Sequence, residues 1–419
     1  MKMKSWIILA IVAVIAVAGI VGFIVEKGKV DSLSAQVKQL EADLKTAQED
    51  LANAKADAAA AAEAQAAAEA EAAAAQTGKA AKVAMVTDYG DITDQSFNQT
   101  TYEACQEWCG ENGVEFTYYK PAGDSTAERV AMIEKAIDDG FTIIVLPGYA
   151  FGEAIGEVQD IYPDVKFIGL DVSESDLGGV ALGENVFCAV YQEELCGYMA
   201  GYASVKLGYK HLGFLGGMAV PAVVRYGYGF VQGADAAAKE LGVDASVEFV
   251  YGNQFYGDAD ITAYMDNWYQ TLGVEVVFAC GGGIYTSAAE AAAKVGGKVI
   301  GVDVDQAGII NGYGEGMTVT SAMKGLAATV KTLLQETIIN DNFAQYGASV
   351  QTLGLVSGTD PEANYVQLPI ASTQWADGFT VDMYKALVAD MFSGALTVSN
   401  DTAAAPTVSI AVNYYGNIK

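Results

Sequence analysis

The stretch Lys298–Gln306, KVIGVDVDQ, is a short apolar run with β-branched Val299, Ile300 and Val302 that ends in Asp303 and Asp305. A run of this length predicts a buried strand, and its polar end predicts the point where the strand leaves the core. Lys166–Val172, KFIGLDV, has the same pattern with the same terminal aspartate, at an offset of 303 − 171 = 132 residues. The stretch is therefore one copy of a repeated unit.

Three further pairs of strand-like segments repeat in the same order at offsets of 247 − 114 = 133, 276 − 143 = 133 and 211 − 82 = 129 residues. They are Val114–Tyr118 with Val247–Tyr251, Ile143–Gly148 with Val276–Gly282, and Lys82–Asp88 with His211–Gly217. Helix-like stretches separate the strands, which predicts parallel sheets built from right-handed crossovers. We expect an α/β protein with two similar lobes: residues 82–205, completed by the C-terminal segments 325–419, and residues 206–324.

The N-terminal part predicts a membrane anchor and a spacer. Residues 1–25 carry Lys2 and Lys4 before the uncharged apolar run Ser5–Val25, which is long enough to cross a bilayer as a helix. The flanking charges place the N-terminus in the cytoplasm and the rest of the chain outside the cell, and cleavage of the run stays open. Residues 26–81 predict an Ala-rich helical stalk with a heptad seam from Leu33, either a coiled-coil homo-oligomer or a lone helix.

Composition excludes several functions. The net charge of −29 argues against nucleic acid as a partner, because phosphate backbones need a basic face. The single histidine, His211, argues against a Ser–His–Asp triad or a zinc site with several His ligands, and its place predicts a strand-end residue. Cys105 and Cys109 lie one helical turn apart, which favours packing over disulfide or metal chemistry. No cofactor is predicted.

Ligands of open parallel sheets bind beyond the carboxyl ends of the strands. This rule selects glycines, carboxylates and aromatic residues in both lobes, which suit a neutral ligand rich in hydrogen-bond donors and containing a flat ring. Stacking could involve Tyr89, Phe97, Tyr226 or Phe255. The other candidates are Asp88, Asn98, Gly148 and Asp171 in the first lobe and Met218, Gly282 and Asp303 in the second.

Several of these residues have a structural alternative. Asp171 could simply cap a helix, and Lys324 could be a solvated lysine at a helix end. Asp303 and Asp305 fall on the same side of an extended segment, so two like charges there need partners and favour a site. The glycines near Gly282 lack a full phosphate-binding motif, which leaves a nucleotide-phosphate site weakly supported.

Motifs from Lys82 to Ser393 resemble the basic membrane protein family, the purine nucleoside receptors of ABC importers. The motifs are TDYGDITDQSFNQ (Thr87–Gln99), GFLGGMAVPAVVRYGYGF (Gly213–Phe230), and IGVDVDQ followed by TSAMKG, which ends in Lys324-Gly325. The resemblance implies a type I periplasmic-binding-protein fold with a nucleoside in the cleft. It assigns base contacts to Asp88, Phe97 and Asn98, ribose contacts to Asp303 and Lys324, and the closing aromatic to Phe255, with Tyr226 in reserve.

Together these inferences predict a membrane-anchored extracellular receptor that passes a purine nucleoside to an ABC permease and its ATPase. It differs from members of the family that are lipoproteins, because no cysteine follows the apolar run. One alternative is a free sugar or signalling furanone as ligand, and another is a sensor that reports ligand to a membrane partner. The third is a nucleoside hydrolase using Asp303 and Asp305, and we expect binding without catalysis instead.

Overall fold

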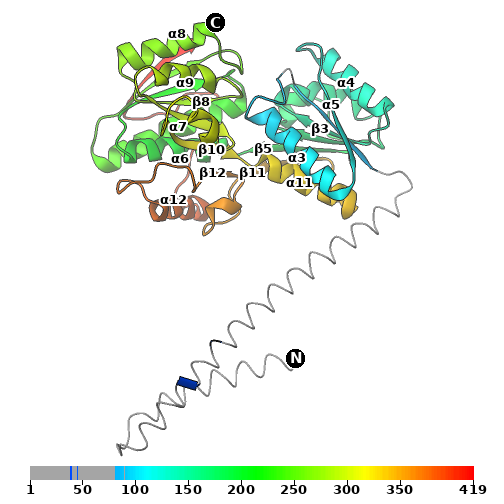
Figure 1. Ribbon diagram of the computed structural model, residues 1–419. Coiled ribbons are helices and arrows are strands. Elements are labelled where there is room, and N and C mark those ends of the chain that lie inside the picture. The colour runs from blue at the N-terminus through cyan, green and yellow to red at the C-terminus, as the bar shows by residue number, and fades with distance from the viewer. Residues whose placement is uncertain (1–37, 40–44, 46–80, 89) are drawn as a thin grey trace, which may run out of the picture. The chain divides into compact units, whose positions relative to one another are not determined.

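The computed structural model describes residues 38–39, 45, 81–88 and 90–419 (Figure 1). Residues 70–419 form one compact unit and residues 1–69 another. The predicted membrane span and nearly all of the predicted stalk lie outside the described residues. Within the stalk range, the described residues Lys38, Gln39 and Lys45 are helical. Within the described part of the chain, no helix combines the length and the apolar character needed to cross a membrane.

The first lobe is built on a sheet of six parallel strands in the order β2-β1-β3-β4-β5-β11. Its strands are β1 (Lys82–Val86), β2 (Glu115–Tyr119), β3 (Ile143–Pro147), β4 (Lys166–Leu170), β5 (Val186–Tyr191) and β11 (Ser349–Leu353). The helices around it are α3 (Phe97–Asn112), α4 (Thr126–Asp138), α5 (Gly152–Val158) and α11 (Leu326–Leu334), with the short elements η1 (Tyr149–Phe151), η2 (Glu174–Leu177), η4 (Gln335–Ile339) and η5 (Phe343–Gln345).

The second lobe is built on a seven-stranded sheet in the order β13-β7-β6-β8-β9-β10-β12, in which only the β10–β12 pair is antiparallel. Its strands are β6 (His211–Gly216), β7 (Ser246–Tyr251), β8 (Val276–Cys280), β9 (Lys298–Asp303), β10 (Thr318–Lys324), β12 (Val366–Gln367) and β13 (Ala411–Asn417). The helices are α6 (Glu193–Lys206), α7 (Pro221–Leu241), α8 (Ala259–Asn267), α9 (Tyr285–Ala293), α10 (Ala307–Ile310) and α12 (Val381–Ser393), with η3 (Trp268–Leu272) and η6 (Pro361–Ala363).

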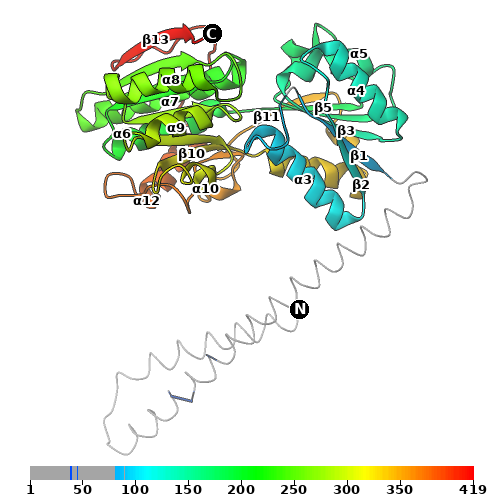
Figure 2. The same ribbon diagram turned by 45° about the horizontal axis from the view of Figure 1, so that its top comes forward.

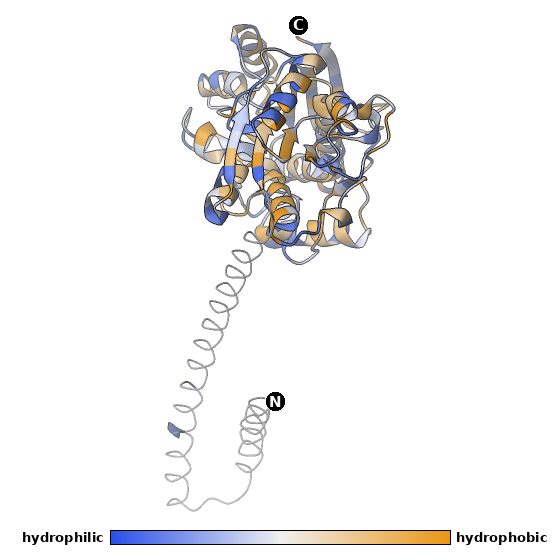
Figure 3. Ribbon diagram, turned by 90° about the vertical axis from the view of Figure 1, so that its right-hand side faces the viewer, coloured by the Kyte–Doolittle hydropathy of each residue, from blue (hydrophilic) through white to orange (hydrophobic). Residues whose placement is uncertain are grey.

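The internal repeat predicted from the sequence is confirmed. The four predicted strand pairs are β1 with β6, β2 with β7, β3 with β8, and β4 with β9, and each set has the same spatial order. The central strands are buried on both faces, as their continuous apolar runs require. Figure 3 colours the hydrophobic residues of the lobes orange. Local signals set the ends of the helices: Gly113 closes α3 in the left-handed conformation, and Ser125 caps the start of α4 by accepting the Glu128 N–H.

Helix α6 packs in the second lobe, which corrects the expected boundary at residue 205. It lies directly against α7 because both helices carry glycines at the contact. A Cβ on Gly201 would overlap the carbonyl oxygen of Phe230, and one on Gly229 would overlap that of Glu194. This close approach of two backbones fixes α6 to α7. The N-terminal segment of the first lobe therefore ends with β5.

The C-terminal segments are shared between the lobes, whereas the sequence assigned all of residues 325–419 to the first. Only α11 and β11 join the first lobe, where α11 packs on α3 and β11 pairs with β5. Strands β12 and β13 extend the second sheet at its two edges, and α12 lies beside α6 (Figures 1 and 2). The chain therefore crosses between the lobes after β5, after β10 and after β11.

The histidine and the cysteines serve the packing of the fold. His211 begins β6, with its Nε2 3.0 Å from Glu248 Oε1, which confirms its interpretation as a strand-end residue. All five cysteines are free thiols and all are buried. Cys105 and Cys109 pack inside from α3, as their spacing predicted.

Candidate functional site

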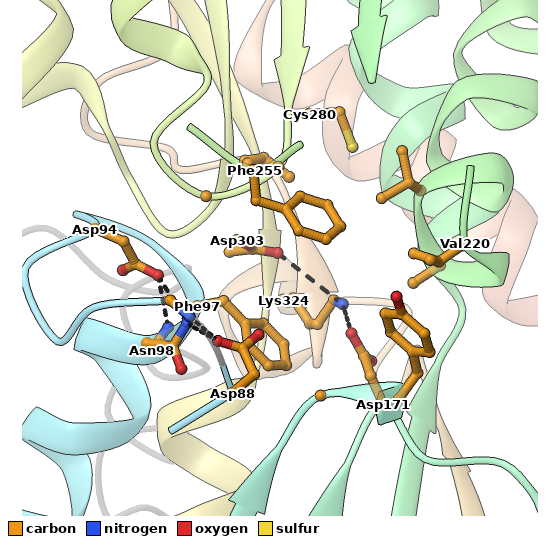
Figure 4. A pocket seen from close by; sticks show the side chains of 18 of the residues that line it. Asp88, Asp94, Phe97, Asn98, Asp171, Val220, Phe255, Cys280, Asp303 and Lys324 are labelled. Atoms are coloured by element: carbon orange, nitrogen blue, oxygen red, sulfur yellow. Dashed lines mark hydrogen bonds and ion pairs between the residues drawn. The ribbon is translucent and has the colours of Figure 1, made fainter. Parts of the chain in front are cut away.

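A cavity of about 620 Å³ lies at the carboxyl ends of the strands of both sheets (Figure 4). Its volume falls within the range of roughly 300–1,000 Å³ that small-molecule sites occupy. The position follows the rule for parallel sheets, because each crossover leaves its loop at that edge. The residues selected from the sequence that line it are Asp88, Phe97, Asn98, Gly148, Asp171, Tyr226, Phe255, Gly282, Asp303 and Lys324.

Two of the sequence candidates are not in this lining. Tyr89 falls outside the described residues. Met218 lies in the loop after β6 and is not among the residues that line the cavity, so its role stays a prediction. The loop turns at this point, with the Met218 carbonyl accepting from the Val220 N–H at 2.8 Å, and the Phe255 ring fills the space next to Gly217.

The charged centre of the site is Lys324, whose side chain is only 2% exposed. Its Nζ lies 2.6 Å from Asp171 Oδ2, 3.1 Å from Glu193 Oε1 and 4.0 Å from Asp303 Oδ1. Burial acts to lower the pKa of Lys324, but these three carboxylates outweigh it and raise the pKa above its usual value. Lys324 is therefore a permanently charged ammonium held between the lobes, not the solvated helix-end lysine of the alternative.

The carboxylates around Lys324 are not fully satisfied. Asp171 Oδ1 is buried without a hydrogen-bond partner, and burial raises the pKa of Asp171 to about 6 even beside the ammonium. Burial also raises the pKa of Asp303. Glu193, which is fully buried, receives the Nε–H of Arg225 at 2.6 Å, and its Oε1 has the Lys324 charge nearby without hydrogen-bond geometry. Spare acceptors of this kind suit a ligand that brings hydroxyl donors.

Asp171 and Asp303 occupy equivalent positions of the two repeats and share an unusual backbone. Their φ angles are 57° and 64°, in the left-handed region that aspartate tolerates better than most residues. This turn ends the extended segment at Asp303, so Asp305 does not follow it into the site. Asp305 is exposed and accepts the Ala307 N–H at 3.0 Å, which corrects the expectation that the two carboxylates face the same way.

On the first lobe, Asp88 and Asn98 form a second polar cluster. Asp88 Oδ1 accepts the Gly90 N–H at 2.5 Å and Asn98 Nδ2 at 3.1 Å, while Asn98 Nδ2 also donates to Asp94 Oδ2 at 3.2 Å. Both partners of this amide are carboxylates, so its nitrogen must face them. Burial raises the pKa of Asp88 to about 6, against the lowering effect of the Gly90 and Asn98 hydrogen bonds. Asp88 Oδ2 bonds to no described residue and lies beside Gly148.

The start of α3 joins this cluster to the second lobe. Ser96 stands at the N-cap position, yet its Oγ donates to Asp303 Oδ2 at 2.6 Å instead of capping the helix. Asp94 caps α3 in its place, accepting the backbone N–H groups of Ser96, Asn98 and Gln99 at 2.9–3.1 Å. The first turn of α3 is therefore free to present Phe97 and Asn98 to the cavity.

Aromatic side chains enter the cavity from opposite lobes. Phe97 comes from α3 and Phe255 from the loop after β7, and Figure 4 shows both rings beside the cluster around Lys324. Gly217 and Gly281 make room for the Phe255 ring, since a Cβ at either position would overlap it. These glycines thus position an aromatic ring, a role that the sequence did not suggest.

Tyr226 is buried beside Asp303 and Lys324 and supports these two residues from below the cavity surface. Its side chain is 1% exposed, with its hydroxyl 3.5 Å from Asp303 Oδ1 and 3.4 Å from the Ala322 carbonyl oxygen. Its ring also stands 5.5 Å from Lys324 Nζ, within reach of a cation–π contact. Tyr226 is thus enclosed, whereas Phe255 is only half-buried and lines the cavity, which makes Phe255 the more accessible of the two second-lobe rings.

Contacts across the cleft hold the lobes together. Besides the Ser96–Asp303 hydrogen bond, Gln306 Nε2 donates to the Gln95 carbonyl at 3.0 Å. Lys324, at the end of β10, makes its 2.6 Å contact with Asp171 of the first lobe. Three charged or polar links thus close the same cleft that forms the cavity.

The sequence missed four residues that build the site: Ser96, Asp94, Glu193 and Arg225. Ser96 and Asp94 carried a signal, because Asp-x-Ser before a helix is a capping pattern and lies next to Phe97. Glu193 and Arg225 carried none. They lie on α6 and α7, and only the packing of those helices brings them to Lys324.

Comparison with known proteins identifies the family. Residues 81–366 match the family model Bmp, "ABC transporter substrate-binding protein PnrA-like". A Lactococcus lactis protein named "ABC transporter nucleoside-binding protein BmpA" is 27% identical over 61% of this chain and 74% of its own length. Basic membrane protein B of Borreliella afzelii is 27% identical over 66% and 79% of the two chains.

Solved structures show the same fold. An ABC transporter solute-binding protein from Conexibacter woesei superposes with a TM-score of 0.59 at 23% identity, covering 77% of this chain and 99% of that one. A solute-binding protein from Aeropyrum pernix gives 0.58 at 21% identity, covering 77% and 88%. The family match extends through both lobes and covers every residue of the cavity lining except Thr402, including the loops after β1, β6, β9 and β10. The chain therefore belongs to the Bmp family of PnrA-like ABC transporter substrate-binding proteins, and it is a binding protein rather than an enzyme.

Proposed function

We propose that the chain binds a purine nucleoside in the cleft and delivers it to an ABC permease with its ATPase. The observation that carries the proposal is the pairing of Phe97 and Phe255 from opposite lobes with two separate acceptor clusters. One cluster, at Asp88, suits the N–H groups of a base, and the other, around Lys324, suits ribose hydroxyls. The nucleoside-binding name of the Lactococcus lactis relative supports the same ligand class.

The charge of the cavity favours a nucleoside over a nucleotide. Its lining holds six aspartates against three basic residues, a formal balance of −3. The aspartates are Asp88, Asp91, Asp94, Asp171, Asp176 and Asp303, and the basic residues are Lys120, Arg225 and Lys324. A 5′-phosphate would add a dianion to this acidic surrounding, and like charges repel strongly in a partly buried site. We expect nucleoside monophosphates to bind much more weakly than the matching nucleosides.

The three crossings between the lobes are the hinges of this proposal. Each lies at an element boundary, and opening about them would separate Ser96 from Asp303 and Asp171 from Lys324. A bound ligand would then take over acceptors that these residues share with one another in the structure. Release to the permease requires the cleft to open again.

The proposed site of action is the outer surface of the membrane. The apolar run Ser5–Val25 supports anchoring in the membrane with the lobes outside, and the Pyrococcus abyssi relative, 30% identical over 43% of this chain and 44% of its own length, is named as a lipoprotein. The stalk of residues 26–81 would hold the lobes away from the bilayer, as a single helix or a coiled-coil pair.

Calorimetric titration of the full chain in detergent tests the proposal. Inosine, guanosine and adenosine should bind, while ribose and guanosine monophosphate should not. Asp303→Ala should abolish binding and leave the fold intact, and Asp305→Ala is the matched control because that carboxylate is exposed. If no nucleoside binds to the folded chain, the proposal fails, and a sugar ligand or a sensor role would be examined next. Release of free base from inosine would also contradict the proposal, because it would show that the chain hydrolyses the nucleoside.

A further inference from the structure

The C-terminal segment after α12 reaches the ligand cavity from outside the family domain. The family match ends at residue 366, whereas Thr402 belongs to the lining of the cavity. No other residue beyond 366 lies in that lining within the described part of the chain. The cleft of this chain therefore has one component that the shared domain does not supply.

Both ends of the segment are fastened to α7. Gln232 of α7 bonds Ser399 twice, with Nε2 donating to the Ser399 carbonyl and Oε1 accepting the Ser399 N–H, each at 2.9 Å. One turn further along α7, Asp235 Oδ1 accepts from the N–H and hydroxyl of Ser409 at 2.8 and 2.6 Å, and from the N–H of Ile410 at 3.2 Å. These paired bonds fix the segment at its start and its end.

Between these anchors, the chain makes a local turn that presents Thr402. Asp401 Oδ1 accepts the Ala403 N–H at 2.8 Å, an Asx turn with Thr402 at its centre. The Asp401 N–H in turn lies 3.3 Å from Ser399 Oγ. The Thr402 hydroxyl is exposed and bonds to no described residue, so its side chain is available to the cavity.

The helix that holds the segment also forms the adjoining wall of the cavity. The first turn of α7, from Val220 to Val223, lies in the same lining as Thr402. After the segment, β13 pairs in parallel with β7 and completes the edge of the second sheet. The segment is thereby part of the second lobe at three places, and it would move with that lobe when the cleft opens.

We propose that residues 399–409 form a fixed outer wall of the ligand cleft and that Thr402 limits the size of the ligand at this end. The inference rests on the proposed function for the nature of the ligand, though not for the position of the wall. A threonine leaves space that a larger side chain would fill. This residue would then set which substituents a nucleoside can carry.

The position of the wall is tested without any ligand, on the full chain in detergent. Thr402→Cys is labelled with N-ethylmaleimide and with a polyethylene glycol maleimide, and Thr407→Cys is the control, because Thr407 is exposed on the same segment but does not line the cavity. The native cysteines are buried, and burial raises the pKa of Cys280, the cysteine that lines the cavity, so the background is low. Relative to N-ethylmaleimide, the polyethylene glycol maleimide should label the cysteine at position 402 more slowly than the cysteine at position 407. The same ratio of the two labelling rates at both positions overturns the inference.

The ligand arm tests the consequence for binding. Thr402→Trp should weaken nucleoside binding at least about tenfold, the effect of overpacking a site by more than 1 kcal/mol, while Thr407→Trp should leave it unchanged. Unchanged affinity in Thr402→Trp overturns the inference. If the wild-type chain binds no nucleoside, the proposed function fails, and the labelling result alone then decides whether the wall exists.

Discussion

Replacing Lys324 by methionine tests the electrostatic account of the site. The substitution keeps an unbranched side chain but removes the one cation that Asp171, Glu193 and Asp303 share. Breaking a buried ionic group by removing one partner costs about 3–5 kcal/mol, because the remaining charges are left uncompensated. We expect Lys324→Met to lose about that amount of unfolding free energy at pH 7.5.

The stability loss in Lys324→Met should depend on pH in a definite direction. Asp171 has a folded pKa of about 6 against 3.8 as an ordinary aspartate, so its contribution to stability is full below 3.8 and is lost as pH rises through 6. Without the ammonium the folded pKa of Asp171 rises further, and at pH 5 this carboxyl is protonated and needs no cation. The stability difference between Lys324→Met and the wild type should therefore shrink between pH 7.5 and pH 5.

Urea unfolding of a fragment that starts at Lys79, followed by tryptophan fluorescence, measures both quantities. Lys331→Met is the matched control, since Lys331 pairs with Glu107 at 2.7 Å where the side chains are 36% and 57% exposed. An exposed pair of this kind contributes about 0–1 kcal/mol. The reasoning is refuted if both variants lose the same stability, or if the loss in Lys324→Met is independent of pH.

Three more outcomes follow from the site. A base N–H donated to Asp88 would lower its pKa from about 6, so nucleoside binding at pH 6 should release protons, seen as a buffer-dependent heat in calorimetry that disappears at pH 8. Phe97→Ala should weaken binding by about 1–3 kcal/mol, the usual contribution of a ring stacked on a base, whereas Phe392→Ala at an exposed position should not. Gly217→Ala should displace the Phe255 ring and reduce affinity with little change in the unfolding midpoint; full affinity would show that the ring does not contact ligand.

The repeat made the two sheets predictable. Buried parallel strands need long apolar runs, and each run ends in a polar residue where the chain leaves the core. This rule located both half-sites, and most of the residues selected from it line the cavity. It did not anticipate that Met218 lies outside the lining or that Asp305 is exposed, because strand ends fix where a loop begins but not how its backbone turns after the first residues.

The C-terminal part was less predictable for a different reason. Strand β13 pairs with β7 across more than a hundred and fifty residues, for example Val412 with Val247, and its residues are mostly exposed. Nothing in its local sequence marks it as a partner of that edge. Glu193 was hidden in the same way, because its neighbours Arg225 and Lys324 come from other elements that only helix packing brings together.

The repeat also places two different residues at equivalent positions of the two lobes. In the first sheet Leu170, just before Asp171, pairs with Ala189; in the second Val302, just before Asp303, pairs with Ala322. Two residues beyond these alanines stand Tyr191 and Lys324, which are thus counterparts, and the ammonium of one lies 5.3 Å from the ring centre of the other. This pair is one of several positions at which the two halves of the cleft differ; another is Asp88, whose counterpart in the second repeat is Gly217. Such differences make the two sides of the cleft unlike and give it a direction.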